Sequence, residues 1–387
     1  MFSMMPFSFL FIFIFIFGSV MSLSSVHWIG IWLGLEINLI GFIPILVYGG
    51  VTQETESGMK YFVVQALGSG MLMMGSLISF NLLFTWETLG SSNFVGLFII
   101  AVGMMLKLGS FPFHFWLPSV MAGISWFSCL VLTTWQKLAP MFLLSSIIEK
   151  MWTLGNWINF LLIFMAGMAS LVGGIGGLNQ TQIRALLAYS SIGHVGWMLL
   201  CCVMGQSVLK VYFLVYFVIS ICIFLVLWSS ENSMFSQTGS LSAEKAKSDS
   251  VYLIFMLLSL GGMPPLLGFV GKWMAIWFCC KEAFPLSVGL LLIGSLISLS
   301  YYLSLLFSVL LLSGTKLSVL SSDSYMSSVS LVNFPGKKAL EPKNLKSLNF
   351  WKNSSDEMLS SLVVFIFMLN LLGGIFIFLS LILADFL

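Results

Sequence analysis

The sequence has 387 residues, of which 59% are hydrophobic and 8% are charged, and its mean hydropathy is +1.05. Soluble domains carry about 25% charged residues, so this composition excludes an ordinary soluble protein, and apolar runs of about 18 or more residues recur along the chain. The net charge of +2 is small and the basic residues are scattered, which argues against nucleic-acid binding.

The apolar runs predict an all-α, polytopic membrane protein with about eleven transmembrane helices. The first run, residues 5–23, has no basic segment before it and no small-residue cleavage site, so we expect a retained membrane helix rather than a secretory signal. The other spans are expected at residues 26–48, 58–83, 92–109, 126–148, 155–176, 184–204, 207–229, 251–280, 285–313 and 358–385.

Two of the runs contain residues that interrupt helices. The fourth run ends at Gly109, and the irregular stretch FPFHFWLPSVMAGIS, which contains Pro112, follows it. The ninth run contains LGGMPPLLG, with Gly261, Pro264 and Pro265. Both patterns predict a broken helix.

The two breaks fall at matching places, in the fourth helix of each of two five-helix units. An odd number of helices places the second unit in the opposite orientation, and paired interrupted segments point to a transport site between inverted repeats. The predicted division is a first repeat over 1–150 with its break near 109–113, a second over 151–313 with its break near 261–268, a polar Ser/Lys-rich loop over 314–357 and a last helix within 358–387.

Four ionisable residues lie deep within the apolar runs: Glu36, Lys107, Lys137 and Lys272. Each would cost about 2.5–3.5 kcal/mol or more at the bilayer centre, so their presence favours a polar pathway. Lysines near helix ends can instead extend to the interface, which would explain Lys60, and Lys107 if its helix ended early. This alternative does not explain Glu36 or Lys137.

These residue types favour proton handling in particular. Removal from water favours a neutral amine, whereas a neighbouring carboxylate favours the charged form. A Glu36–Lys107 pair would therefore act as a switch that retains the lysine proton when closed and releases it when open. The freed carbonyls and amides of a broken helix could hold the water that such a transfer needs.

His114 and His194 are further candidates for proton transfer, although a lone histidine in an apolar protein is more often structural. His194 has Tyr189, Ser190 and Ser191 on nearby turns, which predicts a polar cluster, and His114 could instead cap the broken helix. The cysteines show no CxxC spacing, and there is no GxGxxG or P-loop motif. We therefore expect no redox site, no cofactor and no metal in this chain.

Six phrases carry a resemblance to a known family, and they occur in the family's order: WLGLEINLIGFIPIL, KYFVVQALGS, KLGSFPFHFWLPSV, TTWQKLAP, GGLNQTQIRALLAYSSIGHVGWM and LLSLGGMPPLLGFVGKW. Together they closely resemble the chain 2 family of mitochondrial NADH:ubiquinone oxidoreductase (respiratory complex I), an antiporter-like subunit of the membrane arm. The resemblance extends over roughly Trp28 to Trp273 and is only compositional beyond it.

In that family a glutamate in an early helix pairs with a lysine on a broken helix. A second lysine lies in the next helix and a third beside the second broken helix. The resemblance assigns these roles to Glu36, Lys107, Lys137 and Lys272. It implies a proton-translocating subunit of an enzyme complex whose FMN, iron–sulfur clusters and ubiquinone are bound by other subunits.

The resemblance also implies a place in the mitochondrial inner membrane. The expected partners are other membrane-arm subunits, including chain 4 and chain 4L, accessory subunits and lipids such as cardiolipin, with no nucleic acid. Most basic residues outside the spans would share the side of the N-terminus, which predicts the N-terminus in the matrix and the C-terminus in the intermembrane space. The 314–357 loop is longer than the family usually has, and is expected to be a disordered matrix loop or a docking surface for an accessory subunit.

Two other functions stay open at this point. The chain could be a stand-alone cation/proton antiporter subunit, or a structural spacer of the membrane arm that conducts nothing. Proton pumping after removal of the deep charges would separate the spacer from a conducting subunit.

Overall fold

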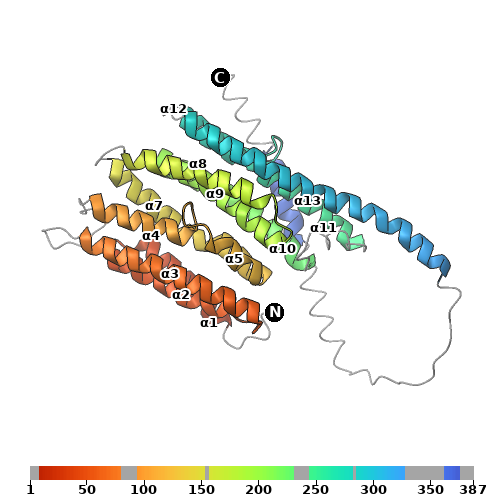
Figure 1. Ribbon diagram of the computed structural model, residues 1–387, viewed down its shortest axis with the longest axis horizontal. Coiled ribbons are helices and arrows are strands. Elements are labelled where there is room, and N and C mark those ends of the chain that lie inside the picture. Colours follow the sequence, from red (N-terminus) through yellow and green to blue (C-terminus); the bar gives the residue numbers. More distant parts are fainter. Residues whose placement is uncertain are drawn as a thin grey trace.

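The computed structural model describes residues 8–79, 94–152, 157–230, 244–281, 285–326 and 361–374, and over these residues the chain is helical and contains no β-strand (Figure 1). The helices are α1 (Ser8–Ser24), α2 (Trp28–Leu46), α3 (Thr52–Ile78), α4 (Phe94–Leu108), α5 (Trp116–Gly123), α6 (Trp126–Thr133), α7 (Trp135–Trp152), α8 (Trp157–Gly177), α9 (Ile183–Met204), α10 (Gln206–Ser230), α11 (Glu244–Gly261), α12 (Leu267–Lys281) and α13 (Pro285–Met326), followed by a helix over 361–374.

Among the described residues, seven helical segments are long and apolar enough to cross a membrane: α2, α3, α6 together with α7, α8, α9, α10 and α13. Shorter apolar helices accompany them, and large hydrophobic side chains such as Phe9, Phe62 and Leu296 lie on the outer surface. An apolar exterior is the opposite of a soluble protein's surface and suits contact with lipid. The predicted all-α, polytopic membrane fold is therefore confirmed, whereas the count of eleven spans stays a prediction.

The helices run alongside one another in a bundle whose centre is α9. In Figure 1, α1 to α4 (red to orange) lie on one side, and α11 to α13 (teal to blue) lie on the other. In the most apolar stretch of α9, 89% of the residues are buried, against 33% in α13. Side chains that α9 presents to its neighbours are consequently well shielded from the surroundings of the bundle.

The first break lies between α4 and α5. Gly109 has φ +68°, a conformation that favours glycine, and it ends α4 by a sharp turn. The backbone N–H groups of Gly109 and Ser110 donate to the carbonyls of Leu106 and Met105, each at 3.2 Å. Pro112 lies in the turn that follows and cannot donate a hydrogen bond to continue the helix.

The second break lies between α11 and α12. Gly261 is the last residue of α11, and Gly262, with φ +85°, turns the chain out of the helix. Pro264 and Pro265 occupy the short turn before α12 begins at Leu267. Both breaks thus fall where glycine and proline coincide in the sequence.

Two features differ from the expected boundaries. The segment expected at 126–148 is interrupted at Thr134, whose hydroxyl donates to the Leu130 carbonyl at 2.6 Å. Helix α13 continues to Met326 rather than ending at Ser313, since leucines and valine recur in this stretch and no proline interrupts it. The remainder of the expected loop, and all of residues 375–385, lie outside the described residues, so the proposed division into repeats stays a prediction.

Candidate functional site

The three deep lysines are buried, and each lies on a different helix around the centre of the bundle. Lys107 in α4, Lys137 in α7 and Lys272 in α12 are 7%, 2% and 8% exposed. Glu36 in α2 is half-buried. Burial of this degree is expensive for an ammonium group unless a polar partner or a proton transfer relieves it.

Lys107 is the second-last residue of α4, next to the first break. Its aliphatic chain packs against Gly68 of α3, where an added Cβ would lie 2.9 Å from Lys107 Cγ. Its backbone carbonyl accepts a hydrogen bond from Gln65 Nε2 at 3.3 Å. The neighbouring Leu106 carbonyl accepts one from the Trp116 indole at 3.2 Å. We expected these carbonyls at the end of α4 to be free to bind water, but side chains of the protein already donate hydrogen bonds to them.

Glu36 and Lys107 are close enough for their charges to interact, but they are not in direct contact. Within the described residues the single ion pair closer than 4.0 Å joins Lys60 and Glu56 at the surface. The structure thus places the predicted pair in the same region without closing it.

Lys137 lies in the first turn of α7, directly after the interruption at Thr134. Its ammonium donates to the backbone carbonyl of Ser191 in α9 at 3.2 Å, and it lies 5.3 Å from the centroid of the Tyr216 ring. A carbonyl and an aromatic face stabilise a cation without neutralising it. Lys137 is therefore held in place by neutral groups.

His194 lies in α9 beside Lys137, and tyrosines of α10 enclose its ring. His194 Nδ1 and the Tyr212 hydroxyl share a hydrogen bond of 3.0 Å, and the Tyr216 ring centroid lies 5.1 Å from that of His194. Of the residues expected beside His194, Ser190 lines the same cavity, and the hydroxyls of Ser190 and Ser191 donate to carbonyls of their own helix. Such back-bonding is common for serine within helices.

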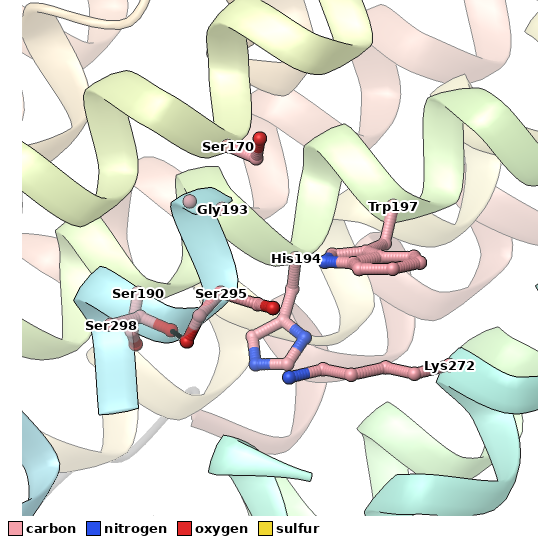
Figure 2. Close-up of a pocket in the computed structure, with 9 residues that line it drawn as sticks. Ser170, Ser190, Gly193, His194, Trp197, Lys272, Ser295 and Ser298 are labelled. Atoms are coloured by element: carbon pink, nitrogen blue, oxygen red, sulfur yellow. Dashed lines mark hydrogen bonds between the residues drawn. The ribbon is translucent and has the colours of Figure 1, made fainter. Parts of the chain in front are cut away.

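Lys272 reaches back across the second break. Its ammonium donates to the Gly261 carbonyl at 2.8 Å, at the end of α11. Figure 2 shows the same ammonium pointing toward the His194 imidazole in a small cavity. The cavity has a volume of about 10 Å³, near the lower limit for one water molecule, and hydroxyls line it from Ser170, Ser190, Ser295 and Ser298.

Lys137, His194 and Lys272 therefore form a continuous group, which we call the central cluster. Both lysines act electrostatically on His194. Glu36 and Lys107 lie outside this group. A part-buried hydrogen bond of 2.7 Å from Gln136 Nε2 to Asn38 Oδ1 joins α7, which carries Lys137, to α2, which carries Glu36. The arrangement supplies closely spaced groups that can each hold or release a proton.

His114 lies apart from the central cluster. Its Nδ1 lies 3.2 Å from the Pro112 carbonyl oxygen, and its ring lies 4.0 Å from that of Phe115, centroid to centroid. These contacts fit the alternative in which His114 stabilises the broken segment.

The sequence analysis did not identify Tyr212 and Tyr216 as members of the site. A signal was present, because the two tyrosines stand four residues apart in a mostly apolar helix, which places both side chains on one face. Polar groups on one face of a membrane helix usually point into the bundle.

A bundle of apolar helices with lysines buried beside two helix breaks defines an antiporter-like membrane protein. Residues 25–298 match the NADH:quinone oxidoreductase/Mrp antiporter family of transmembrane proteins, and the chain belongs to this family. The resemblance found in the sequence is therefore confirmed.

Relatives of this chain include NADH-ubiquinone oxidoreductase chain 2 of Lumbricus terrestris, 42% identical over 294 residues, which are 75% of this chain and 83% of that protein. The protein of the same name from Anopheles gambiae is 39% identical over 325 residues, 82% of this chain and 90% of that protein.

Solved structures support the same fold. A chain of respiratory complex I from Thermus thermophilus with bound Aureothin has a TM-score of 0.73 at 23% identity, covering 95% of this chain and 78% of that chain. A chain of the Mrp complex from Dietzia sp. has a TM-score of 0.71 at 16% identity, covering 77% of this chain and 60% of that chain.

Proposed function

We propose that this chain is a core membrane-arm subunit of NADH:ubiquinone oxidoreductase in the mitochondrial inner membrane, where it takes part in proton translocation. Family membership and the curated relatives named NADH-ubiquinone oxidoreductase chain 2 support the assignment. The observation that carries the translocation proposal is the central cluster, in which two buried lysines flank one buried histidine.

In this proposal, Lys137, His194 and Lys272 pass a proton between them. His194 would take up a proton at Nε2 and release it again from the same nitrogen, because its Nδ1 is held by Tyr212 and its ring faces Lys272 (Figure 2). A charge on one lysine disfavours a charge on the other in a weakly polar interior. Movement of a proton at one end therefore drives movement at the other.

Glu36 and Lys107 would form the input to this path. Closure of the pair favours the charged Lys107, and its opening favours release of the proton. In this proposal, a Glu36–Lys107 pair separated by more than 4.0 Å would represent the open state. Quinone reduction elsewhere in the complex would shift this equilibrium electrostatically, and Lys107 would then exchange its proton toward Lys137.

The remaining expectations belong to the same proposal. The N-terminus would lie in the matrix and the C-terminus in the intermembrane space. Chain 4, chain 4L, accessory subunits and cardiolipin would surround the chain, while FMN, iron–sulfur clusters and ubiquinone would be bound elsewhere in the complex. Electron transfer and the proton steps of this chain would then be coupled over a distance.

The test compares Lys137→Met and Lys272→Met in the assembled complex, reconstituted into vesicles, with electron transfer and vesicle acidification measured in parallel. Loss of a proton-transfer group slows a reaction by about 10²–10⁴-fold, so we expect pumping to fall at least about tenfold. Lys60→Met is the matched control, because Lys60 is an exposed residue whose ion pair with Glu56 contributes little. Normal pumping by both buried-lysine variants would favour a non-conducting spacer.

A stand-alone cation/proton antiporter is the second candidate, and the fold shared with an Mrp complex favours it. A native gel of solubilised inner membranes, stained for NADH dehydrogenase activity, separates the two. Peptides of this chain in the active band would support the complex, whereas peptides only in a small inactive band, together with ion flux by the purified chain, would support the antiporter.

A further inference from the structure

The helix over residues 361–374 carries one polar side chain that is completely buried. Asn370 is 0% exposed, while its neighbours Leu369 and Leu372 are exposed on the apolar surface. A buried amide within a membrane protein is costly unless hydrogen bonds satisfy it. The hydrogen-bond partners of Asn370 therefore indicate its structural role.

Both ends of the Asn370 amide contact the second broken helix. Its Oδ1 accepts a hydrogen bond from the backbone N–H of Leu267 at 3.2 Å, and its Nδ2 lies 3.1 Å from the sulfur of Met256. Leu267 is the first residue of α12, whose N–H has no acceptor within its own helix, and Met256 belongs to α11. One side chain thus bridges the two halves of the broken helix.

The backbone of the same helix lies directly on the turn between these halves. A Cβ added to Gly374 would lie 2.7 Å from the Pro265 carbonyl oxygen and 2.9 Å from the Leu267 nitrogen. Only glycine permits this approach without a shift. The helix over 361–374 therefore packs against the backbone of Pro265–Leu267, where the break leads into α12.

Lys272 depends on the geometry of this break. It lies in α12, five residues after Leu267, and its ammonium reaches the Gly261 carbonyl at the end of α11. The aliphatic chain passes close to Gly262, where an added Cβ would lie 2.9 Å from Lys272 Cδ. A shift of α12 relative to α11 would change this contact and the approach of Lys272 to His194.

We propose that Asn370 is a positioning residue that fixes α12 against α11 and so holds Lys272 at the Gly261 carbonyl and the His194 cavity. The inference rests on the proposed role of Lys272 in proton translocation. It gives the last helix a part in the conducting site, although none of its residues belongs to the central cluster.

The test uses Asn370→Leu, Asn370→Asp and the lipid-facing control Leu372→Ala in the assembled complex. Asn370→Leu removes both hydrogen bonds at similar volume, whereas Asn370→Asp keeps the acceptor for Leu267 and, as the neutral acid, a donor for Met256. Two quantities are measured: amide hydrogen exchange over residues 258–270, with residues 105–118 of the first break as internal reference, and protons pumped per NADH.

We expect Asn370→Leu to raise exchange over 258–270 about fivefold to tenfold, mainly the effect of losing the hydrogen bond from the Leu267 N–H, since sulfur is a weak acceptor, with no change over 105–118. In Asn370→Leu, the number of protons pumped per NADH should fall at least about twofold. Asn370→Asp should bring both the exchange rate and the pumping most of the way back to the wild-type values, and Leu372→Ala should match the wild type in both. If Asn370→Leu prevents assembly on a native gel, Asn370→Ser takes its place with the same expected results.

Three outcomes would overturn the proposal. Unchanged exchange over 258–270 means that Asn370 does not hold the break, and raised exchange with normal pumping means that the break does not position Lys272 for function. Equal loss in the Leu and Asp variants means that only packing matters. Failure of the proposed function is distinguishable, because Lys272→Met would then pump normally whatever the exchange shows.

Discussion

Replacement of Tyr212 by phenylalanine removes one oxygen atom, and with it the hydrogen bond to His194. The hydroxyl and His194 Nδ1 are 3.0 Å apart, and both side chains are buried. Loss of a buried partner costs about 1–3 kcal/mol, and each 1.4 kcal/mol corresponds to about tenfold in a rate or equilibrium. We therefore expect Tyr212→Phe to slow proton pumping by about tenfold, within a range of about fivefold to a hundredfold.

Tyr216→Phe is the control for this prediction, since the structure assigns a different role to that hydroxyl. Tyr216 contacts Lys137 and His194 through its ring, which phenylalanine retains. Its hydroxyl makes a long hydrogen bond of 3.4 Å to the Thr133 carbonyl and no other to the described residues. Pumping by Tyr216→Phe should stay within about twofold of the wild type. Equal defects in both variants, measured in vesicles that hold equal amounts of complex, would refute the argument that Tyr212 orients His194.

Two further predictions concern stability, measured as the thermal inactivation of the purified complex in detergent. Gly109→Ala should destabilise the complex by about 1–2 kcal/mol, because φ +68° is unfavourable for alanine and the new methyl would lie 3.2 Å from the Trp116 ring. Gly70→Ala is the control, because a methyl group there meets nothing within 4 Å. Equal inactivation temperatures for the two variants would contradict the prediction. Arg184→Lys should cost about 1 kcal/mol or more, since Arg184 donates to the Ile124 carbonyl at 2.6 Å while its guanidinium lies 4.9 Å from the Trp126 ring, and lysine cannot make both contacts in the same way. An unchanged inactivation temperature would show that this carbonyl needs no guanidinium.

Features encoded within one helix could be predicted from the sequence. Apolar length predicts the membrane helices, and the coincidence of glycine and proline predicts breaks where α4 and α11 end. The depth of Lys137 within its apolar run also matches its burial. Each of these depends on residues within one apolar run, so no knowledge of the packing is needed.

The partners of the deep charges could not be predicted in the same way, because they come from helices far away in the sequence. Ser191 lies 54 residues from Lys137, and Asn370 lies 103 residues from Leu267. A hydrophobic pattern specifies which face of a helix turns inward, but not which helix it meets. The pairing of Glu36 with Lys107 is predicted from the family resemblance rather than from the hydrophobic pattern, and the resemblance does not decide whether the pair is closed.

The two breaks look equivalent in the sequence, each with a lysine beside it, yet the structure uses the lysines differently. At the first break, Gln65 and Trp116 bind the freed carbonyls, and no described residue accepts a hydrogen bond from the Lys107 ammonium. At the second break, the ammonium of Lys272 itself binds the freed Gly261 carbonyl.

This difference suits opposite tasks within the proposed function. Because other side chains stabilise the end of α4, Lys107 can approach or leave Glu36 without exposing a backbone carbonyl. Lys272 cannot leave the end of α11 without leaving the Gly261 carbonyl unsatisfied, which is costly in a membrane interior. We therefore expect Lys107 to be the lysine that moves with the state of the complex, and Lys272 to exchange its proton in place with His194.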